Sequence, residues 1–140
     1  MDIPLRGLEL GRQFAAVLDA CDYASAAEFL AGQCLYERPS RESLIGPRAI
    51  CDSYRESDER ARRDFDSVVY RSEVTADASG GIRIDFLDEL GSGNAKHTFR
   101  CSQIVYFDDN EKIDRIVLVE IVGERDRLNA FRAAQQIQSH

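Results

Sequence analysis

The change of hydrophobic period after Asp64 constrains the fold of this chain more than any other feature. Upstream, apolar residues recur at helical spacing, whereas downstream they alternate with polar ones in "FDSVVYRSEVTAD", "IRIDFLDEL", "AKHTFRCSQIVYF" and a last run that begins at Lys112. The runs are separated by the short sequences "ASGG", "GSGN" and "DDNE". Four alternating runs joined by short polar turns predict an antiparallel meander.

The first half of the chain predicts helices. Apolar residues at helical spacing from Gly7 to Cys21 predict one helix, and Asp22 is placed to cap a second, short helix that ends at Gly32. "QCLYERP" predicts a short strand ending at Pro39, and "GPRAICDSYRESDERARR" predicts a third helix with proline in its first turn. Helices followed by a meander make an α+β fold. A final helix after the meander is expected to carry on one side Leu128, Phe131 and Ile137.

Charge and composition exclude several classes of protein. The net charge of −7 repels phosphate backbones, so we expect no nucleic-acid partner. No apolar run reaches the ~20 residues of a membrane helix, and the N-terminal segment lacks signal-peptide features, so no membrane partner is expected. A length of 140 residues fits a single domain over residues 1–140. The cysteines, Cys21, Cys34, Cys51 and Cys101, show no Cys-x-x-Cys spacing, which favours a reduced cytoplasmic protein without structural disulfides.

The last run of the meander is apolar on both faces. By alternation, one face carries Ile116, Leu118, Glu120 and Val122, and the other carries Ile113, Val117, Val119 and Ile121. An antiparallel sheet commonly has one dry face and one wet face, so here each face needs a cover. The helices can cover one face, and a second subunit or the C-terminal helix must cover the other. We expect the face with Val117, Val119 and Ile121 to form a symmetric homodimer.

The order of elements, with "IGPRAICDSY" and "YFDDNEKIDRIVLVE", resembles the nuclear transport factor two-like superfamily and, within it, the SnoaL-like cyclases. Gly46, Ala49 and Ile50 match the opening of the family's third helix, and Lys112 matches a lysine after its last turn. Glu111 stands where that signature has glycine. The resemblance implies a single SnoaL-like domain: a curved antiparallel sheet wrapped around the N-terminal helices, forming a cystatin-like cone with a pocket. It also implies a convex face that often forms a dimer.

Glu120 interrupts the apolar last strand and is the first candidate for a site residue. In SnoaL-like cyclases this strand carries an aromatic, an apolar residue and an aspartate at alternate positions, and the resemblance places Ile116, Leu118 and Glu120 there. All three would therefore line the pocket. A carboxyl group among apolar neighbours loses hydration, which favours its protonated form and suits it to acid–base chemistry. The alternative is that Glu120 pairs with Arg125 or Arg127, or reaches solvent.

Candidate partners for Glu120 lie on the preceding strand. His97, Phe99, Cys101 and Gln103 share one face of that strand, which neighbours the last strand in the resembling family. Gln103 is able to hydrogen-bond a ligand or to hold Glu120. His97 titrates near neutrality and is the second catalytic candidate. Its alternative is a solvent-exposed position beside the "GSGN" turn.

The remaining candidates give a pocket without a metal. Tyr36 and Tyr54 would offer hydroxyls at its mouth, unless the rings are core residues. Cys101 and Cys34 would line it, and neither has an adjacent histidine to activate a thiol nucleophile. Two histidines without a local carboxylate motif give no metal ligand set, and no glycine-rich loop precedes a helix, so we expect neither metal nor cofactor.

Three functions fit this pattern. The first is a cofactor-independent isomerase, dehydratase or cyclase that acts on a hydrophobic small molecule, with Glu120 as general acid or base and His97 or Gln103 assisting. The second is a ligand-binding protein with the same pocket and no turnover. The third is a dimeric interaction module. One fold hosts many functions, so the fold does not choose among them.

Overall fold

A computed structural model describes residues 3–138, and the side chains of residues 5–136. The described elements, in chain order, are α1 (Ile3–Asp19), α2 (Tyr23–Glu28), β1 (Leu30–Glu37), β2 (Leu44–Ile45), α3 (Pro47–Asp64), β3 (Ser67–Ala76), β4 (Ile82–Ser92), β5 (Ala95–Phe107), β6 (Ile113–Glu120) and α4 (Glu124–Gln138). The side chain of Ile137, expected on the apolar side of the last helix, lies outside the described set. Over the described range, no helix combines the length and apolarity that a membrane crossing requires.

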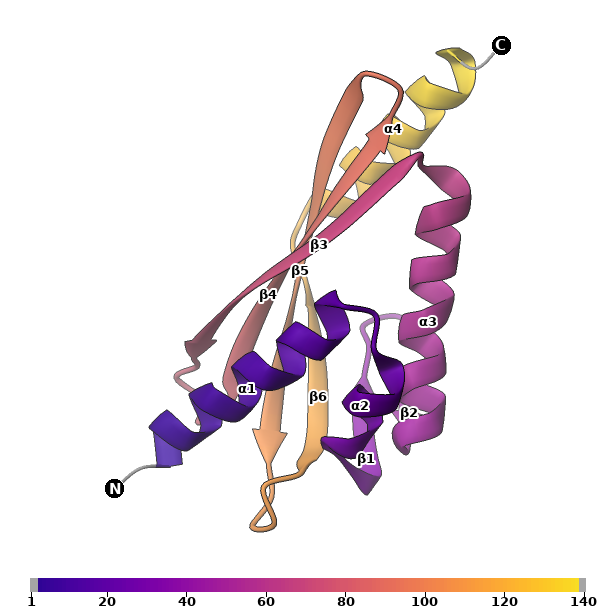
Figure 1. Ribbon diagram of the computed structural model, residues 1–140. Helices are drawn as coiled ribbons and strands as arrows, with labels where there is room; N and C mark the ends of the chain where they lie inside the picture. Colours follow the sequence, from indigo (N-terminus) through magenta and orange to yellow (C-terminus); the bar gives the residue numbers. More distant parts are fainter. Residues whose placement is uncertain (1–2, 139–140) are drawn as a thin grey trace.

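The strands form one mixed sheet in the order β2-β1-β6-β5-β4-β3. Strands β3 to β6 are antiparallel neighbours, which confirms the predicted meander and the α+β class. The predicted antiparallel sheet has one exception, because β1 pairs with β6 in parallel. Parallel neighbours need a long connection, and α3 with the rest of the meander supplies it. Figure 1 shows α1 crossing the sheet, α3 running alongside it and α4 at its upper end.

Local chemistry sets the helix boundaries. The side chain of Asp22 accepts a hydrogen bond from the backbone N–H of Ser25 at 3.2 Å, which caps α2 as predicted. Pro47 begins α3, where its fixed φ suits the first turn. The predicted stop at Gly32 is wrong, because β1 already begins at Leu30 and Gly32 lies inside this strand.

A register shift in β6 corrects the predicted division of its faces. Pairing with β5 is irregular between Tyr106 and Phe107, opposite the start of β6. Ile113 and Ile116 are therefore both fully buried, although they are three residues apart and simple alternation places them on opposite faces. Beyond the shift, Val117 and Val119 lie on the outer face, as the alternation predicts.

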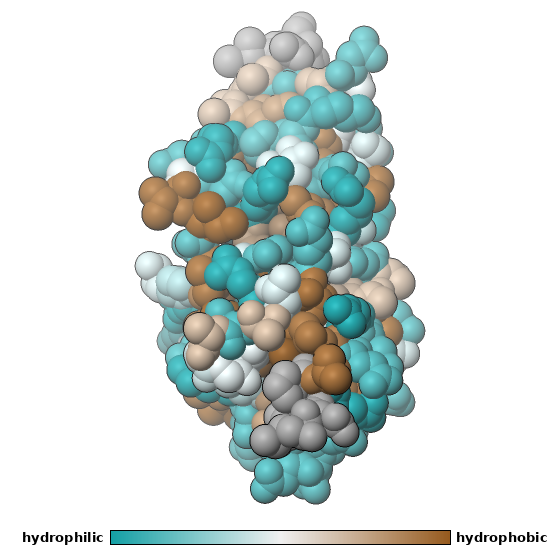
Figure 2. Space-filling model, turned by 90° about the vertical axis from the view of Figure 1, so that its left-hand side faces the viewer, coloured by the Kyte–Doolittle hydropathy of each residue, from teal (hydrophilic) through white to brown (hydrophobic). Residues whose placement is uncertain are grey.

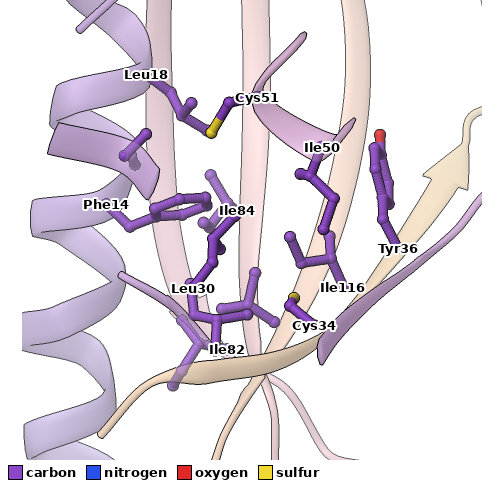
Figure 3. Packing of buried hydrophobic residues seen from close by; sticks show 14 residues of the cluster. Phe14, Leu18, Leu30, Cys34, Tyr36, Ile50, Cys51, Ile82, Ile84 and Ile116 are labelled. Carbon is purple, nitrogen blue, oxygen red and sulfur yellow. The ribbon is translucent and has the colours of Figure 1, made fainter. Parts of the chain in front are cut away.

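The core lies between the inner face of the sheet and the helices α1 to α3. Phe14 on α1 is fully buried and packs against Phe29, with ring centroids 5.7 Å apart. Ile84 and Ile116 are fully buried on the sheet side of the same cluster. Figure 3 shows this cluster, with α1 on one side and β-strands on the other. Burial of this face by helices follows from the helical and alternating apolar patterns meeting at one surface.

The outer face of the sheet mixes apolar side chains with ion pairs. Val117 and Val119 are only half-buried on it. The ion pairs of this face are Arg71–Glu89, Arg83–Asp85 and Arg115–Glu37. Ile121, which was expected on this face, follows the end of β6 and lines the inner side of the molecule instead, because the strand alternation stops at Glu120. The homodimer through this face stays a prediction.

Exposed large apolar side chains are distributed over separate elements. Among them are Leu5 on α1, Ile45 on β2 and Val69 on β3. Because β2 and β3 are the two edge strands, Ile45 and Val69 lie at opposite edges of the sheet. Figure 2 shows one side of the molecule, largely hydrophilic, with apolar side chains gathered in its lower half beside the N-terminal end of α1.

The turn between β5 and β6 gives a prediction about stability. Glu111 has a φ of 62° there, a conformation that favours glycine, and its side chain pairs with Arg6. We expect Glu111→Gly to raise the melting temperature by about 2 to 4 °C, because relief of the backbone strain outweighs the loss of an exposed ion pair. Glu111→Ala loses the pair and keeps the strain, so it should melt below the wild type. Equal melting temperatures for the two variants would contradict this account.

Candidate functional site

A cavity of about 470 Å³ lies between the inner face of the sheet, α3 and the start of α4. This size is within the range of small-molecule sites. Its apolar lining includes Leu18, Phe65, Phe86, Leu90, Phe99 and Leu118. Its polar lining includes Asp19, Tyr36, Tyr54, Asp58, Tyr70, Asp88, Gln103 and Glu120. An apolar chamber with a few convergent polar groups is the usual form of a site for a hydrophobic ligand.

Asp88 is the most perturbed carboxyl group of this cavity. It lies on β4 between Phe86 and Leu90 along the same inner face, and it is half-buried. Burial, and then the negative charges of Asp19 and Asp58, raise the pKa of Asp88 from 3.8 to about 7. Asp88 is not among the site residues predicted from the sequence. The alternation of "IRIDFLDEL" places it on the apolar face of its strand, which is the signal that singled out Glu120.

The two neighbouring carboxylates are stabilised by partners that Asp88 lacks. Asp58 accepts hydrogen bonds from the Tyr70 hydroxyl at 2.7 Å and from Arg62 Nε at 2.9 Å. Asp19 accepts one from the Ser72 hydroxyl at 2.6 Å. Asp88 has no hydrogen-bond or ion-pair partner among the side chains described. The pKa of Asp88 is therefore raised by burial and repulsion with no side-chain partner to offset them.

Glu120 faces the same cavity from β6. It pairs with Cys101 across the strands, so both side chains point to the inner face, and both line the cavity. The Glu120 side chain is nevertheless exposed, which corrects the expectation of a desolvated carboxyl. The cause is its place at the last position of the strand, where the cavity opens to solvent. The expected contact with Gln103 is also not formed, because tyrosines bind that amide.

The arginines proposed as alternative partners of Glu120 have other contacts. Arg127 forms an ion pair with Glu124 at 2.8 Å, and Arg125 lies over the ring of Phe99, 5.2 Å from its centroid. Glu124 is buried and accepts a hydrogen bond from the backbone N–H of Arg100 at 3.0 Å. The first residue of α4 is thereby fastened to β5, and this contact holds the helix in place as one wall of the cavity.

Tyr54, Gln103 and Tyr36 form a hydrogen-bonded chain across the cavity. The Tyr54 hydroxyl donates to Gln103 Oε1 at 2.8 Å, and Gln103 Nε2 donates to the Tyr36 hydroxyl at 3.3 Å. The two tyrosine rings lie 5.9 Å apart. Burial raises the pKa of both hydroxyls, so both stay protonated at neutral pH. These residues thus combine the two expected roles, since their rings pack in the core and their polar ends reach the cavity.

Cys101 lies between the two carboxyl groups on the inner face. It is opposite Phe86, the neighbour of Asp88 along β4, and opposite Glu120 on β6. Burial, followed by the charge of Asp88, raises the pKa of Cys101 to about 12. Burial likewise raises the pKa of Cys34 to about 12. Neither thiol is an activated nucleophile, because the reactive thiolate is disfavoured at both.

Solved structures share this architecture, whereas no protein-family model and no curated protein matches the sequence. Bal32a, from a soil-derived mobile gene cassette, matches with a TM-score of 0.63 at 13% identity, over 83% of this chain and 89% of its own. A putative polyketide cyclase from Xanthomonas campestris pv. campestris matches at 0.65 and 14% identity, over 88% and 96%. The epoxide hydrolase/cyclase-like enzyme SalBIII matches at 0.67 and 12% identity, over 89% and 97%. The fold is SnoaL-like.

The SnoaL-like fold places His97 outside the cavity, so the predicted pocket position is wrong. β5 continues beyond the cavity beneath α4, and His97 lies at that far end. Its ring stacks on Phe131 of α4, with centroids 5.1 Å apart and planes 19° apart. Its Nε2 is buried without a hydrogen-bond partner among the described residues. Without contact to the cavity, His97 has no route to a ligand bound there.

The other predicted pocket residues divide between the cavity and the core of the SnoaL-like fold. Ile116 is fully buried beneath the cavity and does not line it, because the core closes over this level of β6. The predicted pocket residues that do line the cavity are Tyr36, Tyr54, Cys101, Gln103, Leu118 and Glu120. Side chains 5–136 contain no cluster of histidine, cysteine and carboxylate that could hold a metal ion.

Proposed function

We propose that this protein is a cofactor-independent enzyme of the isomerase, dehydratase or cyclase kind that acts on a hydrophobic small molecule. Asp88 would serve as the general acid and Glu120 as the general base. The observation that carries the proposal is that both carboxyl groups face one apolar cavity from different environments, one half-buried and one exposed. Titratable pairs in such contrasting environments suit opposite roles in proton transfer.

The arrangement supports transfer of a proton from one side of a ligand to the other. Asp88, with a pKa of about 7, is present in both protonation states at neutral pH and is able to donate. Glu120 supplies a carboxylate at the mouth of the cavity. The two lie on β4 and β6, separated by β5 and offset by two residues in register, so their backbones are about 12 Å apart at the usual strand spacing and rise. A flat ring system fits between groups at that separation.

The structural neighbours agree with this chemistry. One is described as a putative polyketide cyclase and another as an epoxide hydrolase/cyclase-like enzyme, names that refer to forming or opening rings. Ring closure and ring opening both require one group to give a proton and another to take one. The proposal for this chain is therefore of the same reaction type, with its own pair of carboxyl groups and an unassigned substrate.

Deuterium exchange tests the proposal without knowledge of the natural substrate. We expect the wild type to accelerate exchange at the carbon next to the carbonyl of 1-tetralone in D2O, followed by proton NMR. Asp88→Asn and Glu120→Gln should each reduce the catalysed rate by about 10²- to 10⁴-fold. Asp85→Asn, on the outer face of the same strand as Asp88, should leave it unchanged. Wild-type exchange no faster than that of the Asp88→Asn, Glu120→Gln double variant would contradict acid–base catalysis. Opening of the styrene oxide ring provides a parallel assay of the same variants.

A second candidate function is ligand binding without turnover. The exposure of Glu120 favours it, because a hydrated carboxylate is a weaker base for proton abstraction from carbon. In this case 1-tetralone would bind with no acceleration of exchange by any variant. An interaction module formed through the homodimer is the third alternative, and it predicts no dependence on cavity residues.

A further inference from the structure

The hydrogen-bonded chain of Tyr54, Gln103 and Tyr36 has a direction that determines what the cavity can recognise. An amide side chain donates through nitrogen and accepts through oxygen, so each of its ends accepts only one polarity of partner. Here the oxygen end faces Tyr54 and the nitrogen end faces Tyr36. Tyr54 must therefore donate, and Tyr36 must accept.

The two distances support this orientation of the amide. O–H···O bonds are usually 2.5–3.0 Å long, and N–H···O bonds 2.7–3.2 Å. The contact of 2.8 Å to Tyr54 fits an O–H donor, and the contact of 3.3 Å to Tyr36 is close to the range for an N–H donor. A flipped amide would make the longer contact an O–H···O bond, further outside its range. The geometry thus favours Gln103 Nε2 facing Tyr36.

One proton of this chain is left without an acceptor. Tyr36 uses its oxygen to accept from Gln103, and its own O–H finds no acceptor among the side chains described. The residue is 5% exposed, so little of it meets the outer surface of the protein. Figure 3 shows the hydroxyl directed away from Cys34 and Ile116, at the end of the core cluster. Tyr36 lines the cavity, which is the remaining place for an acceptor.

The surroundings favour a ligand oxygen at this point. Arg38 lies over the Tyr36 ring, 5.9 Å from its centroid, and Arg41 lines the same part of the cavity. Burial raises the pKa of Tyr36 despite the opposing charges of Arg38 and Arg41, so the hydroxyl remains a donor. An oxygen that becomes more negative during proton transfer would be stabilised by the hydroxyl and by these two cations.

We propose that Tyr36 donates a hydrogen bond to an acceptor oxygen of the ligand, and that Gln103 and Tyr54 act as positioning residues that keep its proton directed into the cavity. The site then selects hydrophobic molecules that carry a carbonyl or ether oxygen over hydrocarbons of the same shape. This deepens the proposed function and rests on it only in that the cavity binds a ligand, since the selection operates with or without turnover.

The test compares binding of 1-tetralone with binding of tetralin, which lacks the carbonyl group. Tyr36→Phe should weaken binding of 1-tetralone by about five- to tenfold and leave tetralin unaffected, as expected for loss of one hydrogen bond. Tyr23→Phe is the matched control, because it removes a cavity hydroxyl that does not belong to the hydrogen-bonded chain. It should change the affinity for neither compound. With [1-13C]-1-tetralone, the carbonyl NMR signal should move downfield on binding to the wild type and to the control, but not to Tyr36→Phe.

Gln103→Glu tests the positioning role. An ionised carboxylate accepts hydrogen bonds from both tyrosines, so at pH 8 it should turn the Tyr36 proton away from the ligand while the shape of the cavity is kept. The preference for the ketone and the carbonyl shift should be lost, as in Tyr36→Phe. The Tyr36→Phe, Gln103→Glu double variant should bind 1-tetralone no more weakly than either single variant. If Gln103→Glu does not fold, the Tyr36→Phe comparison still decides the donor role.

Two outcomes would overturn the inference. One is an equal change of affinity for 1-tetralone and tetralin in Tyr36→Phe. The other is a wild type that binds 1-tetralone with no carbonyl shift, or does not bind it at all. Failure of the proposed function would give a different result. The protein would then not accelerate deuterium exchange, but it would still prefer the ketone and show the carbonyl shift.

Discussion

Asp88→Asn is expected to stabilise the protein above pH 7 by about 2 to 4 kcal/mol. In the unfolded chain this carboxyl group releases its proton near 3.8, whereas in the folded protein it holds it to about 7. As pH rises between these values, ionisation of Asp88 lowers the free energy of the unfolded state, while Asp88 stays protonated in the folded state. The wild type therefore loses stability over this window, and the full difference corresponds to about 4 kcal/mol. Asparagine removes the cost, because it has no charge to bury.

Urea denaturation at a series of pH values from 4 to 8 measures this effect. The two proteins should differ least near pH 4, where Asp88 is protonated in the folded protein and only about half ionised in the unfolded chain, and they should diverge as pH rises. Asp85→Asn is the control with the opposite sign. Burial alone would raise the pKa of Asp85, but hydrogen bonds from Ser102 and Arg83 hold it below its usual value. Asp85→Asn should therefore destabilise the protein at neutral pH, and a similar loss in both variants would refute the distinction.

Phe14→Ala is expected to lower the free energy of unfolding by about 3 to 5 kcal/mol. Phe14 is fully buried and joins α1 to the sheet and to Phe29, the residue that ends α2. Its removal leaves a cavity that the surrounding strands can fill only in part. Urea denaturation at pH 7 measures the loss. Leu5→Ala on the same helix is the control, because Leu5 is 67% exposed and its loss should cost under about 0.5 kcal/mol. A comparable loss in both variants would contradict the placement of Phe14 in the core.

The meander could be predicted because its information is local. Each strand shows its own alternation, and each turn carries its own glycine, asparagine or aspartate, so the antiparallel order follows from neighbours in the chain. The parallel pairing of β1 with β6 joins distant segments and leaves no local signal. The register shift before Ile116 also leaves no signal in the sequence. Simple alternation therefore places Ile113 on the outer face, although it is buried on the inner one.

The candidate site could be predicted in part for related reasons. Alternation along β6 correctly indicates that Glu120 shares a face with Leu118, but it carries no information about where a strand ends and solvent begins. The same alternation along β4 places Asp88 on the apolar face of its strand, but alternation alone does not show that this face lines a cavity at Asp88. His97 shares a face with Cys101 and Gln103, as predicted, yet α4 covers its end of the strand, and the packing of a terminal helix is not readable from the strand beneath it.

The parallel pairing of β1 with β6 has a consequence for folding kinetics. Tyr36 on β1 reaches its register beside Ile116 only after the chain between them has folded back, whereas the hairpins of the meander close through contacts near in sequence. Contacts between distant segments form slowly, because loop-closure entropy opposes them. The Tyr36 hydroxyl therefore reaches its place at a late step of folding, when Gln103 is already positioned on β5. During refolding of the full chain, the two carboxyl groups would therefore be placed on the meander before the Tyr36 hydroxyl that we propose binds the ligand oxygen.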